Sequence, residues 1–227
     1  MIHTILFDLD DTLYPRQVGI MEQIRVLILR YLRTQLHLSL EEAEALRGQY
    51  LQTYGTTMRG LQLDYHIDPD EYLRYVHNVP LHEYLQPNPD LDVALASIPQ
   101  EKIVFTNASR EHAERVLDLL GIRRHFSRIV DVRDMDYESK PQPAAYRRIC
   151  DLLDARPTEC LLVEDSVRNL RPAKALGMVT VLVGEDGNSA GDGVDYVIPR
   201  IEEIDLVVED LCRITPLKRI APDTGPS

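Results

Sequence analysis

The sequence has no apolar stretch near the roughly 18 to 20 residues that a membrane-spanning helix needs. Its N-terminus lacks a basic segment followed by a long apolar one, so we expect no secretory signal peptide. Basic residues are few, 25 against 37 acids, and the net charge is −12. This charge argues against nucleic acid or an anionic membrane as a partner, but it allows a small anionic substrate at one local basic site.

Cysteine is also scarce, and Cys150, Cys160 and Cys212 are scattered without the spacing of a metal site. An odd, unpaired set suits a reducing compartment, so we expect a cytoplasmic protein with structural thiols. The 227 residues, 44% of them apolar, predict one large domain, or a core with a smaller companion.

What the sequence does contain is an acidic cluster directly after its first apolar run. Residues 2–7 predict a short buried strand, and Asp8, Asp10 and Asp11 follow it. Carboxylates this close repel one another and raise one another's pKa, so a cation is needed to hold them. Their hard oxygens favour Mg²⁺ or Ca²⁺. Taken alone, an Asp-x-Asp segment is more often an acidic surface turn, so the cation site depends on the rest of the chain.

A long helical segment follows the acidic cluster. Apolar spacing predicts helices over 21–36 and 40–54, and Asp68 with Pro69 marks the start of another. The glycine-bounded residues 54–61 predict a loop or bend. Because a strand-to-helix connection normally takes only a handful of residues, an insertion of this length is expected to be a lid or a substrate domain.

From Lys102 onward the pattern alternates between apolar strands and helices. The expected strands cover 102–106, 126–132, 160–163, 178–183 and 196–198. Continuous apolar strands between helices indicate a parallel sheet covered on both faces. The sequence therefore predicts an α/β fold, with a Rossmann-like core of residues 1–14 plus 88–215 and an inserted α-helical cap of residues 15–87. Residues 216–227 have little to bury and are expected to form a loose tail.

Polar side chains gather where the predicted strands end, which is where open parallel sheets bind ligands. The set comprises carboxylates, a hydroxyl, amides and an amine: Asp8, Asp10, Thr106, Asn107, Lys140, Glu164, Asp165 and Asn169. Together such groups can hold a divalent metal and a phosphate.

These strand ends resemble the four motifs of the haloacid dehalogenase-like hydrolase superfamily. Residues 8–12 match its first motif, Asp-x-Asp-x-Thr, and Thr106-Asn107 match the second. Lys140 matches the third motif and residues 164–166 the fourth. The resemblance covers about residues 2 to 200 in order and spacing, and it implies a Rossmann-like core with a helical cap after the first motif.

The resemblance also implies roles for these residues in a Mg²⁺-dependent phosphatase. Asp8 would be the nucleophile that forms an aspartyl-phosphate. Asp10 would protonate the leaving group and then activate water, and its presence argues against a dehalogenase. The metal would be held by the Asp8 carboxylate, the Asp10 backbone carbonyl and the Asp165 carboxylate. The phosphate would be bound by Thr106, the Asn107 backbone N–H and Lys140.

Several of these residues also have a purely structural interpretation. Glu164 either supports the metal or is a satisfied structural acid. Asn169 stands where the family often has an acid; it either supports metal-bound water or N-caps the next helix, and we favour the cap. Lys140 taken alone could be a solvent lysine, and Thr106 could simply end its strand.

A finer resemblance is to the pyrimidine 5′-nucleotidase branch of the superfamily. It rests on residues 7–15, the cap segment 54–61, and residues 79–81 and 85–87. It implies a nucleoside 5′-monophosphate substrate, with polar cap groups from Thr56, Thr57 and Arg59. Arg59 could instead be a surface arginine in a turn between helices.

Other functions stay open at this point. A sugar phosphate or phosphoglycolate is the alternative substrate, and a phosphotransferase on the same core is the alternative reaction. A binding module that has lost turnover is a third class, which the full set of catalytic groups argues against. We expect a small-molecule phosphate ester as the partner and a monomer or small homo-oligomer as the assembly.

Overall fold

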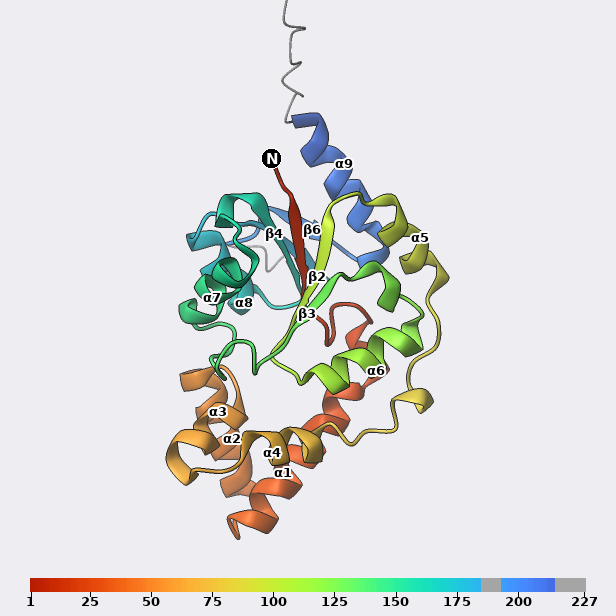
Figure 1. Cartoon of the computed structure of the whole chain (residues 1–227). Helices are drawn as coiled ribbons and strands as arrows, with labels where there is room; N and C mark the ends of the chain where they lie inside the picture. Colours follow the sequence, from red (N-terminus) through yellow and green to blue (C-terminus); the bar gives the residue numbers. More distant parts are fainter. Residues whose placement is uncertain (185–192, 215–227) are drawn as a thin grey trace, which may run out of the picture.

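The computed structural model describes residues 1–184 and 193–214. These residues form one six-stranded parallel sheet in the order β3-β2-β1-β4-β5-β6, so the chain's first strand lies at its centre (Figure 1). The strands are β1 (Thr4–Phe7), β2 (Glu101–Phe105), β3 (Arg128–Val130), β4 (Cys160–Glu164), β5 (Val179–Val183) and β6 (Tyr196–Ile198). The predicted α/β fold with a parallel sheet is confirmed. The predicted loose tail, residues 216–227, lies outside the described residues.

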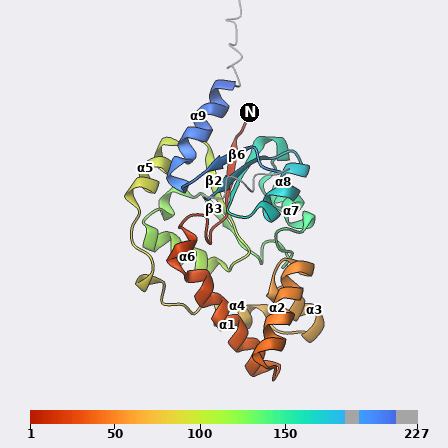
Figure 2. The ribbon, with the colours of Figure 1, turned by 180° about the vertical axis from the view of Figure 1, so that it is seen from behind.

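Helices cover both faces of the sheet (Figures 1 and 2). One face carries α5 (Pro89–Ser97), α6 (Arg110–Leu120) and α9 (Ile204–Ile214), and the other carries α7 (Pro143–Leu153) and α8 (Val167–Ala175). Side chains along β1 alternate between the two layers: Ile5 and Phe7 join the first apolar cluster and Leu6 joins the second. The uninterrupted apolar run of β1 is thus explained by burial on both faces.

Of the five α-helices between β1 and β2, the first four lie beyond the carboxyl ends of the strands (Figure 1). They are α1 (Ile20–Gln35), α2 (Leu40–Tyr54), α3 (Thr57–Tyr65) and α4 (Pro69–Val76). The expected helix starts are confirmed, because Ser39 forms a capping box with Glu42, and Asp68 caps α4 ahead of Pro69.

The prediction of a loop over residues 54–61 is wrong, because α3 begins inside that segment. Only Gly55, at φ +88°, interrupts the helical conformation. The Thr56 hydroxyl then caps α3 by accepting from the Arg59 backbone N–H. Gly60 lies within the helix for a packing reason: a Cβ there would be 2.2 Å from Cγ of Tyr50. The second glycine therefore permits a close helix contact rather than a bend.

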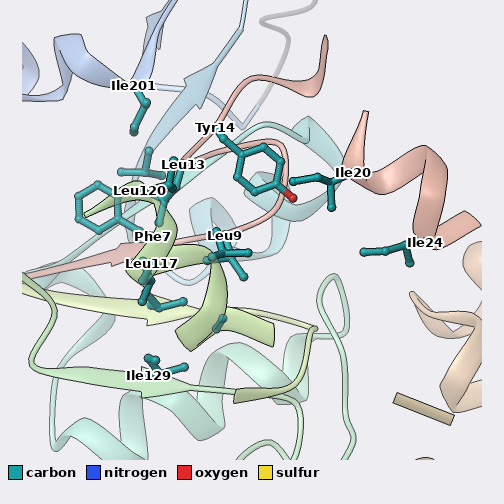
Figure 3. Packing of buried hydrophobic residues seen from close by; sticks show 14 of the residues in the cluster. Phe7, Leu9, Leu13, Tyr14, Ile20, Ile24, Leu117, Leu120, Ile129 and Ile201 are labelled. Carbon is teal, nitrogen blue, oxygen red and sulfur yellow. The ribbon is translucent and has the colours of Figure 1, made fainter. Parts of the chain in front are cut away.

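One continuous apolar cluster joins the inserted helices to the sheet. Figure 3 shows it passing from Phe7 on β1 and Leu117 on α6, by way of Tyr14, to Ile20 and Ile24 of α1. The division into a core and a cap at residues 14 and 87 stays a prediction. Within residues 1–184 and 193–214, no helix is both long and apolar enough to cross a membrane.

Candidate active site

A buried lysine lies at the centre of the site. The Lys140 Nζ donates to Asp8 Oδ1 at 2.6 Å, to Glu164 Oε1 at 2.9 Å and to the Phe105 carbonyl at 2.8 Å. Its side chain is 1% exposed, so the solvent-lysine interpretation is wrong. All three ammonium protons are used, which joins the carboxyl ends of β1, β2 and β4 through one cation.

The electrostatics of this cluster are unbalanced, with three carboxylates around one ammonium group. Burial alone would lower the pKa of Lys140, but Asp8 and Glu164 raise it above its ordinary value, so the lysine stays charged. Burial raises the pKa of Asp8 although Lys140 opposes the shift. Burial and the nearby Asp8 raise the pKa of Asp165 to about 6. A second cation at this position would stabilise the charged forms of Asp8 and Asp165 and so lower the pKa of both carboxylates.

The donor set of the cluster fits Mg²⁺. Carboxylate oxygens of Asp8, Glu164 and Asp165 lie within 4.8 Å of one another, and hard oxygen ligands are the ones this ion prefers. Glu164 is already occupied, because its Oε1 accepts from Lys140 and Asn169 and its Oε2 accepts from the Ser166 N–H at 3.0 Å. Asp8 and Asp165 are therefore the carboxylates best placed to hold the metal.

Asn169 supports Glu164 and does not cap a helix. Helix α8 begins at Val167 with Ser166 at the N-cap position, three residues earlier than a cap at Asn169 requires. The Asn169 side chain lies in the first turn and donates from Nδ2 to Glu164 Oε1 at 2.6 Å. The favoured N-cap prediction is therefore wrong.

The second motif, Thr106-Asn107, holds the loop that carries Lys140, here called the lysine loop. The Asn107 side chain donates from Nδ2 to the Lys140 carbonyl at 2.9 Å and accepts from the Lys140 N–H at 2.8 Å. This two-point pairing holds the backbone that carries the lysine, a role that the sequence did not indicate. Thr106 is 2% exposed, and its hydroxyl accepts from the Ala108 N–H at 3.0 Å.

The second aspartate, Asp10, has hydrogen-bond partners of its own. The Tyr14 hydroxyl donates to Asp10 Oδ1 at 2.5 Å, and His112 Nε2 lies 2.8 Å from the same oxygen. Burial alone would raise the pKa of Asp10, but His112 and the Tyr14 hydroxyl bring it below its ordinary value.

Neither partner was singled out from the sequence, although both carry a detectable signal. Tyr14 is four residues after Asp10. His112 falls four residues before Val116, on the apolar face of α6, where a buried imidazole needs a polar partner.

The polar cap residues contact the loop that precedes Lys140. The Thr56 hydroxyl lies 3.1 Å from that of Ser139, and Arg59 Nη2 donates to Glu138 Oε1 at 2.7 Å. Thr57 is 3% exposed, and its hydroxyl has no hydrogen-bond partner among the residues that the structure describes. The inserted helices and the loop before Lys140 therefore meet through polar contacts beside the site, and a substrate role for these three residues stays a proposal.

Comparison with known proteins identifies the family. The chain is 28% identical to the glyceraldehyde 3-phosphate phosphatase of Methanopyrus kandleri, over 94% of this chain and 100% of that protein. It is 26% identical to phosphate metabolism protein 8 of Saccharomyces cerevisiae over 78% of its own length, and it spans 60% of that relative.

The fold is shared with a haloacid dehalogenase-type (HAD) phosphatase from Thermococcus onnurineus, at a TM-score of 0.62 and 22% identity over 91% of this chain and 98% of the other. A sequence model of one hydrolase family matches residues 2–177, most of the chain. The chain therefore belongs to the haloacid dehalogenase-like hydrolases.

Proposed function

We propose that this hydrolase is a Mg²⁺-dependent phosphatase that acts on a small phosphomonoester through an aspartyl-phosphate on Asp8. The arrangement of Asp8 carries the proposal. Its carboxylate contacts the buried Lys140 and lies close to Glu164 and Asp165, an acidic cluster that needs another cation. Asp10, two residues further along the chain, is hydrogen-bonded to other side chains. An anion that attacks a phosphate needs such charge compensation.

The reaction divides between the two aspartates. An oxygen of Asp8 bonds to phosphorus as the bond from phosphorus to the leaving oxygen breaks, and Asp10 gives a proton to that oxygen. In the second step Asp10 takes a proton from water while the water oxygen attacks phosphorus, which frees inorganic phosphate and restores the Asp8 carboxylate. Lys140 holds Asp8 in place throughout. Bound Mg²⁺, held by Asp8 and Asp165 with the Asp10 carbonyl, would neutralise charge on the phosphate.

The substrate has two candidate classes. The cap segment favours a nucleoside 5′-monophosphate, whereas the name of the archaeal relative points to a three-carbon sugar phosphate. Thr56 and Arg59 already contact Ser139 and Glu138, so the nucleotide assignment rests on the sequence resemblance alone. Selectivity in such folds lies in the groups over the site rather than in the phosphate site itself.

The test is phosphate release from a panel of esters with Mg²⁺, with and without chelator. The panel contains UMP, CMP, AMP, glyceraldehyde 3-phosphate, phosphoglycolate and a hexose phosphate. We expect chelator-sensitive release that is lost in Asp8→Asn, by a factor on the order of 10³ or more. Preference within the panel decides the class of ester. Appreciable phosphate release by Asp8→Asn would contradict the assignment of Asp8 as the nucleophile. Transfer of the phosphoryl group to an added alcohol, rather than release of inorganic phosphate, would favour a phosphotransferase.

A further inference from the structure

Both hydrogen bonds to the Asp10 carboxyl end on the same oxygen. Tyr14 and His112 each contact Oδ1, at 2.5 and 2.8 Å. With the His112 hydrogen on Nε2, Oδ1 accepts both bonds, so Oδ2 is the oxygen that holds the proton whenever the Asp10 carboxyl is protonated. We propose that Tyr14 and His112 are positioning residues that hold the Asp10 carboxyl so that Oδ2 delivers and takes the proton. This inference rests on the proposed phosphatase function.

Packing fixes both donors in place. Tyr14 is 2% exposed and lies in the apolar cluster between Leu13 and Ile20 (Figure 3). Burial and the neighbouring Asp10 raise the pKa of Tyr14 above its ordinary value, so its hydroxyl remains a donor. His112 is 1% exposed, on the first turn of α6. A carboxyl group clamped by two immobile donors loses little orientational freedom when a substrate binds.

A second imidazole supports the His112 ring from the side of the inserted helices. His77 ends α4, and its ring stacks on His112 with centroids 4.4 Å apart and an interplanar angle of 22°. Its Nδ1 lies 3.0 Å from the Ser109 hydroxyl, and its carbonyl accepts from Arg115 Nη1 at 3.1 Å. The His112 ring is thus held by a stack as well as by Asp10, and the stack joins the end of the cap to the acid.

The chemistry predicts which substrates depend on this clamp. When the bond from phosphorus to an alkyl oxygen breaks, the departing alkoxide is strongly basic and needs the Asp10 proton. When 4-nitrophenyl phosphate reacts, the departing phenolate is stable and leaves without that proton. Loss of the clamp should therefore slow aspartyl-phosphate formation from alkyl esters and spare the aryl ester, a pattern that general destabilisation does not produce.

The experiment measures alcohol release in a single turnover with Mg²⁺, from the best alkyl ester of the panel and from 4-nitrophenyl phosphate. We expect Tyr14→Phe and His112→Leu to slow the alkyl ester about 10- to 100-fold and the aryl ester less than about threefold. His112→Gln, which keeps an N–H near the Nε2 position, should recover most of the rate. Tyr196→Phe is the matched control, since it removes a hydroxyl that contacts Asp210 far from the site.

Two outcomes would overturn the clamp. Equal slowing of both esters, with Gln no better than Leu at position 112, would reduce these residues to a folding role. Unchanged rates on both esters in folded Tyr14→Phe and His112→Leu would remove any role in positioning. By contrast, a wild-type enzyme that releases phosphate from no ester would contradict the proposed function itself, so the two failures are distinguishable.

Discussion

Gly55 at the end of α2 touches the backbone of Lys140 so closely that a Cβ on it would lie 2.5 Å from the Lys140 carbonyl oxygen. The glycine has φ +88°, a conformation that costs a residue with a side chain about 1 to 2 kcal/mol. Because that carbonyl also accepts from Asn107, a shift here would move the loop that holds the lysine.

The first prediction follows from this contact. Gly55→Ala should lower kcat/KM at least about tenfold, because displacement of the lysine loop misplaces the cation beside Asp8. The matched control is Gly48→Ala within α2, where an added Cβ meets nothing within 4 Å. That variant should keep full activity and gain up to about 1 kcal/mol in unfolding free energy. Equal kinetics in the two variants would show that the Gly55 contact does not position Lys140.

A second prediction concerns the buried charges. Lys140→Met leaves Asp8 and Glu164 without their shared cation and should lower the free energy of unfolding by about 3 to 5 kcal/mol. Adding Glu164→Gln removes one of the stranded charges, so the double variant should regain stability while remaining inactive. Urea unfolding and phosphate release measure the two properties separately. A single variant as stable as the wild type would mean that the ion cluster is not coupled to the fold.

Metal binding gives a third prediction. Mg²⁺ at one hundred times its dissociation constant should stabilise the protein by about 2.7 kcal/mol, seen as a rise in Tm that chelator reverses. Asp165→Asn should abolish that rise, because it removes one of the two carboxylates assigned to the metal. Asp151→Asn, an exposed position on α7, is the control and should respond as the wild type does. An intact Mg²⁺ response in Asp165→Asn would place the metal elsewhere.

The fourth prediction is a pH dependence of stability that arises from His77. Burial, with His112 beside it, lowers the pKa of His77 to about 3, whereas an unfolded histidine titrates near 6.5. The unfolded chain therefore binds the proton first, so stability is full above pH 6.5 and falls as the pH drops toward 3. From pH 7.5 to 5.5 this one group should cost about 1.4 kcal/mol.

Urea unfolding at the two pH values measures this loss. His77→Asn, which retains a polar atom near the Nδ1 position, is the comparison and should lose about 1.4 kcal/mol less over the same interval. Contributions from groups that do not contact His77 are the same in both proteins and cancel in the difference. A parallel pH dependence in the two proteins would show that His77 is protonated without cost in the fold.

Periodicity and strand ends predicted most of this architecture from local signals. Apolar runs marked the strands, capping residues marked α2 and α4, and the four motifs marked the sheet edge that now carries Asp8 and Lys140. Helix α3 was missed because Gly60 is, by its local propensity, a helix-breaking residue. The structure shows that it is needed there for close packing against the Tyr50 ring. Local propensity yields there to a tertiary contact.

Two of the site contacts that sequence reasoning missed depend on pairs distant in the chain. The Asn107 side chain meets the Lys140 backbone 33 residues away, and His112 meets Asp10 across 102 residues. No spacing rule links such positions, since the fold alone decides which strand end faces which helix. Asn169 shows a different error, because the side chain that could have capped the helix instead donates to Glu164, five residues earlier in the chain.

The central position of β1 has a consequence for how the chain reaches this state. The first of the six strands along the chain lies between β2 and β4, which both come much later in the sequence, and its Phe7 pairs with Val104 and Val163. During synthesis β1, which is apolar on both faces, cannot pair with both of its neighbours until most of the chain has left the ribosome. Contacts so distant in sequence slow folding and expose the waiting segment to aggregation. We therefore expect the ordering of β1, the strand that leads to Asp8, to be a late event in folding.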